Sequence, residues 1–159
     1  MATHKNNLSS FNKTDIPSAK GFSFGIIVSE WNNEITSSLL DGAKNTLIEC
    51  GVLEKNISVL TVPGSFELIY GAKLMSKDGF DGLICLGSII KGETKHFDFI
   101  CNAVTNGIME LNLILDIPVI FGVLTDNTLN QAKDRSGGKH GNKGIESAIT
   151  AIKMVNLNV

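Results

Sequence analysis

The sequence predicts a three-layer α/β/α sandwich around a central four-stranded parallel sheet, and two observations carry this prediction. From residue 21 onward, short apolar segments alternate with longer segments whose apolar residues recur at helical spacing. The short segments are apolar along nearly their whole length, which is typical of parallel strands buried on both faces. Strands that alternate with helices in this way favour a sheet with helices on both sides, joined by right-handed crossovers.

Each element is predicted from its own pattern. Strands are expected at 22–28, 57–62, 82–86 and 118–124, where aliphatic and aromatic residues dominate. The first helix is expected to be capped by Asn33 and to end at Gly51, because leucines and alanines between them recur at helical spacing. The remaining helices are expected at about 65–75, 95–115, 129–134 and 142–155, with a glycine-rich loop at 136–144.

Length and composition set the broad class. The 159 residues fit one domain, in which the polar residues 1–20 form a flexible arm and residues 21–159 the folded part. A net charge of −2 provides no basic surface for nucleic acid or for a membrane, and no apolar run approaches membrane-spanning length. The three cysteines lie in apolar segments without metal-ligand spacing. They indicate free thiols in a reducing compartment, so a cytoplasmic location and no metal are expected.

The segment 87–96, with the sequence GSIIKGETKH, is the richest in chemistry. We expect it to form a polar turn at the carboxyl end of the third strand, where open α/β sheets bind ligands. Its glycines, its Thr94 hydroxyl and its backbone N–H groups suit an anion. His96 follows directly, and histidine is the side chain best suited to moving protons near neutral pH. The segment therefore predicts phosphate chemistry with an acid–base partner, the alternative being a capping or solvent-exposed His96.

Two residues at other strand tips are candidates for substrate binding. Trp31, the only tryptophan, is predicted to stack on a planar heterocycle, the alternative being a packed core aromatic. Glu67 is predicted to accept hydrogen bonds from substrate hydroxyls, the alternative being a helix cap. Because parallel strands end at one edge of a sheet, the strand-tip segments are expected to converge. These segments are 30–32, 63–67, 87–96 and 124–126.

Arg135 is the only arginine in the chain. Its guanidinium suits a phosphate, but a surface charge beside a flexible loop explains the residue equally well. The sequence contains neither GxxxxGK[ST] nor GxGxxG. Their absence disfavours a nucleoside triphosphatase and a dinucleotide-binding domain.

Several motifs together resemble the lumazine synthase family, in the family's order and from about residue 22 to the C-terminus. They are WN at 31–32, VPGSFE at 62–67, GSIIKGETKHFD at 87–98, FGVLT at 121–125 and the segment 135–144. The pairing of VPGSFE with GxxIKGxTxHFD is highly specific to that family. The resemblance implies the flavodoxin-like form of the fold.

The resemblance also implies the penultimate reaction of riboflavin biosynthesis. In that reaction 5-amino-6-(D-ribitylamino)uracil condenses with 3,4-dihydroxy-2-butanone 4-phosphate to form 6,7-dimethyl-8-ribityllumazine. Phosphate and water are released, and no metal or redox cofactor takes part.

Site residues follow from the resemblance position by position. His96 matches the proposed proton donor. The residues that match the pyrimidine and ribityl site are Trp31, Ser65, Phe66, Glu67, Ser88, Ile89 and Ile90, with Phe121 closing the pocket from an adjacent subunit. Those that match the phosphate site are Glu93, Thr94 and Arg135, and Asn32 and Lys143 are further candidates.

Three positions depart from the commonest family pattern. Lys91 stands where arginine is frequent, and Trp31 replaces a frequent phenylalanine but keeps a stacking surface. Glu93 stands where a small residue is common. Its backbone N–H is expected to contact the phosphate, while its carboxylate leaves the strength of phosphate binding open.

Assembly is also implied by the resemblance. The family forms homopentamers, and in some members these dock into an icosahedral 60-mer. The short loop at 137–144 favours the shell here. The resemblance further implies an association with riboflavin synthase.

Two other classes of protein use related features. A flavin- or lumazine-binding protein without catalysis would use the same aromatic ring and phosphate turn, but the presence of both His96 and Arg135 speaks against it. A response-regulator-like domain shares the sheet architecture. It needs an acidic cluster and a phosphorylatable aspartate at the strand tips, where this chain has Glu30–Trp31 and Gly87–Ser88.

Overall fold

The computed structural model describes residues 9–158, so the part of the expected arm at 1–8 lies outside the described residues. Its middle layer is a parallel sheet with the strand order β2-β1-β3-β4. In chain order the strands are β1 (Phe24–Ser29), β2 (Ile57–Val62), β3 (Gly82–Ile90) and β4 (Val119–Asp126). This order begins as in flavodoxin-like folds, with a switch point between β1 and β3.

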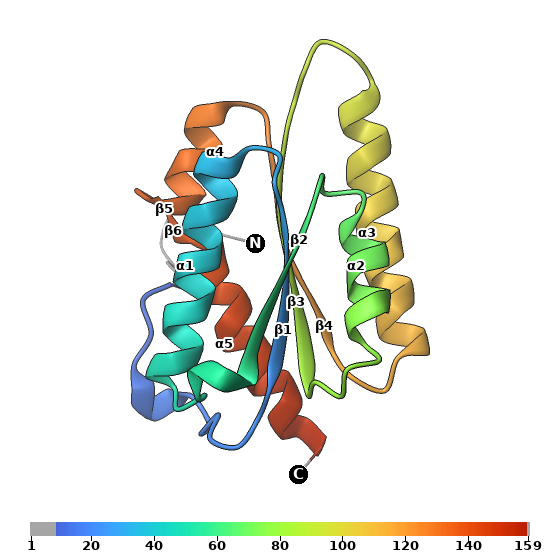
Figure 1. Cartoon of the computed structure of the whole chain (residues 1–159). Coiled ribbons are helices and arrows are strands. Elements are labelled where there is room, and N and C mark those ends of the chain that lie inside the picture. Colours follow the sequence, from blue (N-terminus) through green and yellow to red (C-terminus); the bar gives the residue numbers. More distant parts are fainter. Residues whose placement is uncertain (1–8, 159) are drawn as a thin grey trace.

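Helices cover both faces of the sheet (Figure 1). On one face lie α1 (Asn33–Glu49), α4 (Leu129–Arg135) and α5 (Lys143–Val155). On the other lie α2 (Leu68–Met75) and α3 (His96–Ile114). The predicted three-layer α/β/α sandwich is confirmed.

Successive side chains of a strand point to opposite faces of the sheet, and the core is accordingly divided into two clusters. On β1, Ile26 and Val28 pack in the cluster that contains residues of α1 and α5, whereas Ile27 packs in the cluster that contains residues of α2 and α3. All three side chains are buried, as expected for a central parallel strand. The sheet is therefore held rigidly from both sides, and its carboxyl edge is a fixed platform for loops.

The predicted end of the first helix is confirmed at Gly51. Its φ of 102° is a left-handed conformation that glycine adopts without strain. The backbone N–H of Gly51 donates to the Ile48 carbonyl at 3.0 Å, and that of Val52 donates to the Leu47 carbonyl at 3.0 Å. These two bonds form a Schellman motif, which satisfies the last carbonyls of the helix.

Several predicted boundaries are wrong. The third strand does not end at residue 86 but continues to Ile90, because the neighbouring β4 supplies pairing partners as far as Asp126. Residues 87–90 are therefore strand, not turn. The N-cap position of the first helix is not Asn33 but Asn32, whose side chain makes no capping hydrogen bond, and α2 begins at Leu68 rather than at 65. The expected loop at 136–144 contains a small antiparallel hairpin, β5 (Ser136–Gly138) and β6 (Gly141–Asn142).

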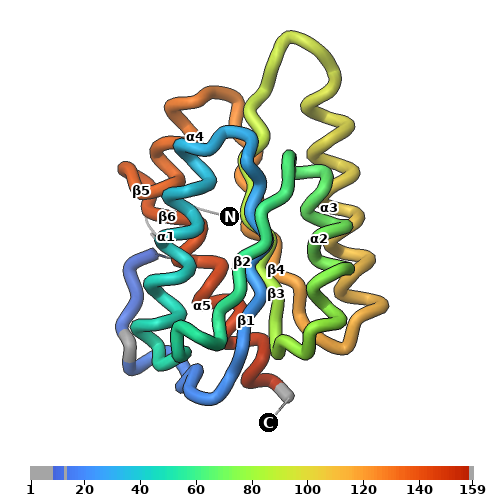
Figure 2. Tube along the Cα trace, viewed as in Figure 1, coloured from blue at the N-terminus to red at the C-terminus, as the bar shows by residue number. Residues whose placement is uncertain are grey.

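Residues 9–20 contact the body of the same chain. Ser9 Oγ accepts a hydrogen bond from the Asn142 N–H at 2.7 Å, and the Ala19 N–H donates to the Cys50 carbonyl at 3.2 Å. Ala19 is fully buried. In Figure 2 this segment runs down the outside of the α1 layer before β1 begins. No helix within residues 9–158 is long and apolar enough to cross a membrane.

Candidate active site

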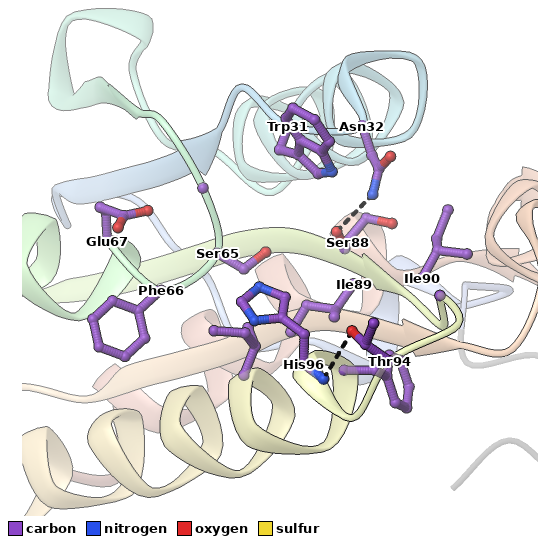
Figure 3. A pocket seen from close by; sticks show the side chains of 14 residues that line it. Trp31, Asn32, Ser65, Phe66, Glu67, Ser88, Ile89, Ile90, Thr94 and His96 are labelled. Atoms are coloured by element: carbon purple, nitrogen blue, oxygen red, sulfur yellow. Dashed lines mark hydrogen bonds between the residues drawn. The ribbon is translucent and has the colours of Figure 1, made fainter.

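A cleft of about 500 Å³ opens at the carboxyl edge of the sheet, which is the size range of small-molecule sites. Three of the four expected strand-tip segments converge on it, and the fourth, at the end of β4, does not line it. The lining residues are Trp31, Asn32, Gly64, Ser65, Phe66, Glu67, Ser88, Ile89, Ile90, Gly92, Thr94, His96, Phe97 and Ile100. In Figure 3, Trp31 and Asn32 lie on one side of the end of β3, and His96 and Thr94 lie on the other.

Asn32 joins the two strands at the switch point. Its backbone is left-handed, with φ 59° and ψ 46°, and it is the only residue other than glycine with positive φ in the described chain. Asparagine tolerates this conformation better than most residues. Its side-chain Nδ2 donates to the Ser88 carbonyl at 2.9 Å, which ties the tip of β1 to the end of β3 (Figure 3).

Two exposed aromatic rings form apolar walls of the cleft. Trp31 is 73% exposed and Phe66 is 51% exposed, so the packed-core alternative for Trp31 is wrong. The backbone N–H of Trp31 donates to the Pro63 carbonyl at 3.1 Å. This bond continues the contact between β1 and β2 beyond the sheet and fixes the backbone from which the indole projects. An exposed ring on a fixed backbone suits stacking against a planar ligand.

The segment 63–67 forms the turn between β2 and α2. Ser65 is buried, and a Cβ added at Gly87 would lie 2.6 Å from Ser65 Oγ, so this close approach of the turn to β3 favours glycine. Glu67 occupies the N-cap position of α2, but its side chain makes no capping hydrogen bond. The helix-cap alternative is therefore wrong, and the exposed carboxylate lines the cleft.

His96 is the first residue of α3 and follows the turn that carries Gly92 and Thr94. Its backbone N–H donates to Thr94 Oγ1 at 3.3 Å, which orders the last residues of the turn. The imidazole is exposed and lines the cleft, on the side opposite Trp31 in Figure 3. A base in this place can exchange protons both with a ligand in the cleft and with solvent.

Two polar side chains on β3, those of Ser88 and Cys85, are buried. Ser88 Oγ is buried and has no hydrogen-bond partner within the described residues. Burial raises the pKa of the Cys85 thiol to about 12, so it stays protonated and is no nucleophile. The titratable side chains that line the cleft are those of His96 and Glu67, and Thr94 adds a hydroxyl group.

The chain is similar in sequence to proteins of one known family. Residues 21–159 match the sequence profile of the 6,7-dimethyl-8-ribityllumazine synthase family. The chain belongs to this family. A 6,7-dimethyl-8-ribityllumazine synthase of Christiangramia forsetii is 58% identical over 99% of this chain and 95% of its own length. One of Parabacteroides distasonis is 52% identical over 99% of each chain.

Membership of the lumazine synthase family confirms the predicted resemblance and settles the class of protein. The chain is a transferase-type enzyme of riboflavin biosynthesis. The response-regulator-like and non-catalytic binding alternatives are therefore wrong.

The cleft brings together ten of the fourteen residues named from the sequence. The four residues absent from its lining are Glu93, Phe121, Arg135 and Lys143. Glu93 is an exposed residue of the turn, and Phe121 lies on the edge strand β4, packed against the α2–α3 side of the sheet. The cleft of a single chain therefore contains Trp31, Glu67 and His96 but neither Arg135 nor Lys143.

The alternative prediction, that Arg135 is a surface charge beside a flexible loop, is wrong. Its side chain is only 16% exposed and forms an ion pair with Glu146, with Nη2 2.9 Å from Oε1. Its Nη1 donates to the His140 carbonyl at 2.7 Å. Burial raises the pKa of nearby Asp126, and the charge of Arg135 opposes that rise. Arg135 is thus held in a defined place at the end of α4.

Sequence reasoning missed four lining residues, Gly64, Gly92, Phe97 and Ile100, and it also missed Glu146. Phe97 stands inside the motif that contains His96, so position alone would have suggested it. Glu146 has no motif of its own. Its signal is a lone carboxylate in the otherwise small and apolar stretch 144–152.

Proposed function

We propose that the chain condenses 5-amino-6-(D-ribitylamino)uracil with 3,4-dihydroxy-2-butanone 4-phosphate to give 6,7-dimethyl-8-ribityllumazine, phosphate and water. One observation carries the proposal. A single cleft combines an exposed stacking ring, a carboxylate without a capping role, and a histidine at the end of a glycine-containing turn. These are the groups that a heterocycle, its polyol chain and a phosphate-bearing ketone need.

Each group has a binding role in the proposal. Trp31 stacks on the pyrimidine, and the backbone of residues 88–90 holds the edge of its ring. Glu67 accepts hydrogen bonds from the ribityl hydroxyls beside Ser65 and Phe66. The phosphate lies against the backbone N–H of Glu93 and the hydroxyl of Thr94, before the start of α3.

The chemistry is a series of proton transfers. The amine of the pyrimidine adds to the ketone to give a carbinolamine, which loses water to become an imine. Phosphate then leaves, the second nitrogen closes the ring, and a further dehydration completes the lumazine. His96 takes and returns protons during these steps. The larger contribution is that the cleft holds two substrates together, since proximity alone contributes roughly 7–11 kcal/mol.

The cationic groups come from a neighbouring subunit in this proposal. Arg135, Lys143 and Phe121 do not line the cleft of their own chain. The outer surface of α2 and α3 carries exposed apolar side chains, namely Tyr70, Leu74, Phe99, Met109 and Leu113. Such a surface favours burial against another protein. We propose a homopentamer, docked into an icosahedral 60-mer, located in the cytoplasm and associated with riboflavin synthase.

The experiment that tests the activity mixes the two substrates with the purified protein and follows lumazine fluorescence. Product is expected only when both substrates and the protein are present. A folded, assembled protein that forms no lumazine would overturn the proposal. Light scattering tests the assembly, because a mass of about 85 kDa, five times 17.1 kDa, means a free pentamer instead of a shell.

A further inference from the structure

The strand β3 extends beyond its neighbour β1 where it borders the cleft. The pairing of the two strands ends at Val28 and Leu86, whereas β3 continues to Ile90 and stays paired there with β4. No residue of β1 is paired with residues 87–90. A stretch of strand edge without a neighbouring strand presents backbone donors and acceptors that another molecule can use.

The pairing with β4 fixes the direction of the peptide groups at this edge. The Lys91 N–H donates to the Asp126 carbonyl of β4 at 2.9 Å. Because successive peptide groups along a strand point to opposite edges, the N–H and C=O of Ile90 point away from β4, and so does the C=O of Ser88. These groups therefore face the side of the cleft on which Trp31 lies.

Asn32 supplies the donor that β1 lacks at this point. The backbone N–H of Trp31, the next residue along from Glu30, turns to the other side and donates to the Pro63 carbonyl at 3.1 Å. The side-chain Nδ2 of Asn32 instead donates to the Ser88 carbonyl at 2.9 Å, as Figure 3 shows. The amide therefore takes the place of a strand N–H, and the backbone of Ile90 is the next part of this edge.

Asn32 is itself held by a second element. Its carbonyl accepts hydrogen bonds from the Ile35 N–H at 2.8 Å and from the Thr36 N–H at 3.1 Å, in the first turn of α1. Its left-handed backbone, with φ 59°, connects this helix to Trp31. The spacing between the exposed Trp31 ring and the edge of β3 thus depends on Asn32.

We propose that Asn32 is a positioning residue for the pyrimidine substrate, which aligns the Trp31 ring with the open edge of β3. This inference rests on the proposed function for its ligand. A pyrimidine stacked on Trp31 carries its N–H and C=O groups in the plane of the ring, so they meet the Ile90 backbone only at one spacing. By occupying the Ser88 carbonyl, Asn32 also removes an acceptor that would compete for the ring N–H.

Three roles for Asn32 differ in what they predict. A role in stability alone leaves substrate binding intact in the folded protein. A direct contact between the Asn32 amide and the substrate lowers affinity whether or not Trp31 is present. Positioning lowers affinity for the pyrimidine only while the Trp31 ring is there to be aligned, so the effects of the two residues are coupled.

The test uses Asn32→Gly, which accepts the left-handed backbone and removes the amide. We expect KM for the pyrimidine to rise about tenfold, the effect of losing one hydrogen bond in the site, with calorimetric binding of the pyrimidine alone weakened in parallel. KM for the butanone phosphate should stay within about twofold. Asn32→Asp has the same shape but sets an oxygen against the Ser88 carbonyl, so it should bind the pyrimidine no better than Asn32→Gly.

A matched control is Asn112→Ala. The Asn112 Nδ2 also joins a helix to strand backbone, since it donates to the Val119 carbonyl at 2.8 Å, but it does so at the amino end of β4. The control should lower the urea midpoint, as Asn32→Gly does, and leave both Michaelis constants unchanged. A rise in the pyrimidine KM of this variant as well would mean that lost stability, not lost alignment, weakens binding.

A double-mutant cycle with Trp31→Ala separates this inference from the proposed function. In the Trp31→Ala background, Asn32→Gly should have less than about a third of its effect on the pyrimidine KM, because no ring is left to align. If Trp31→Ala leaves that KM unchanged, the stacking assignment in the proposed function is wrong, and this inference falls with it. If Trp31→Ala raises the KM but Asn32→Gly does not, or if the two effects add in full, Asn32 is not a positioning residue.

Discussion

Asn32 combines an unusual backbone with a specific side-chain bond at the tip of β1. Two variants separate these contributions. Asn32→Ala loses the bond to the Ser88 carbonyl and places a Cβ at φ 59°, so we expect a loss of about 2–3 kcal/mol in the free energy of unfolding. Asn32→Gly loses the bond but accepts the backbone, so about 1 kcal/mol is expected. Urea unfolding measures both, and equal losses would show that the backbone conformation carries no strain.

His96 lines the cleft, and in the proposed mechanism it is one of several groups that accelerate the reaction. We expect His96→Ala to slow turnover by up to about 10²-fold and to leave measurable activity, because in the proposed mechanism the rest of the cleft still holds both substrates together. Single-turnover lumazine formation at saturating substrate measures this step. Complete inactivity in a variant that still assembles and binds substrate would mean that proton transfer, not proximity, dominates.

The residue types on the cleft were predictable, whereas some of their conformations were not. An exposed Trp31 follows from its place between a strand end and a polar Asn32, and the structure confirms that exposure. The left-handed backbone of Asn32 was not predictable, because Asn32 and Asn33 offer the same side chain for the cap. Which of the two takes the N-cap position depends on the reach from Asn32 to β3, a contact 56 residues away in sequence.

At the scale of elements, a close backbone contact between α1 and α5 depends on Gly144. A Cβ added there would overlap the Leu39 carbonyl of α1, which is backbone and cannot turn aside. We therefore expect Gly144→Ala to cost about 3 kcal/mol of unfolding free energy through forced displacement of the two helices. Thermal or urea unfolding measures the loss. Gly92→Ala is the stability control, since its added Cβ would meet nothing within 4 Å.

Element boundaries were harder to predict than the elements themselves. The four strands of the parallel sheet and the five α-helices of residues 9–158 were expected in the right order, mainly from periodicity. The extension of β3 through Gly87–Ile90 was not, because glycine and serine suggest a turn and only pairing with β4 makes those residues extended. The β5–β6 hairpin was missed for the same reason, since glycines dominate its sequence and its pairing is tertiary context.

At the scale of the whole molecule, the sequence predicted residues that one chain does not bring together. Phe121 and Arg135 follow the family motifs, yet neither lines the cleft that contains Trp31 and His96. Periodicity describes a single chain, and only the family resemblance implied that Phe121 closes the pocket from an adjacent subunit. The exposed apolar surface of α2 and α3 favours burial against another protein, which supports the proposal of a site shared between subunits.

Subunit mixing tests whether the site is shared. Trp31→Ala chains keep Arg135, and Arg135→Ala chains keep Trp31, so each variant alone lacks one half of every site. When the two are co-expressed at equal levels, about a quarter of the interfaces in a heterologous ring should combine two intact halves. We expect the kcat/KM for lumazine formation to recover to about that fraction of the unmodified protein.

The control for mixing pairs Trp31→Ala with His96→Ala. Both residues line the cleft of one chain, so no mixed interface contains an intact site and no recovery is expected. Native mass spectrometry confirms that each preparation contains mixed oligomers. Recovery in the control as well would mean that the Trp31 and His96 used together come from different chains. Absence of recovery with Arg135→Ala in confirmed mixed oligomers would place Arg135 outside the shared site, and the ion pair with Glu146 would then serve stability alone.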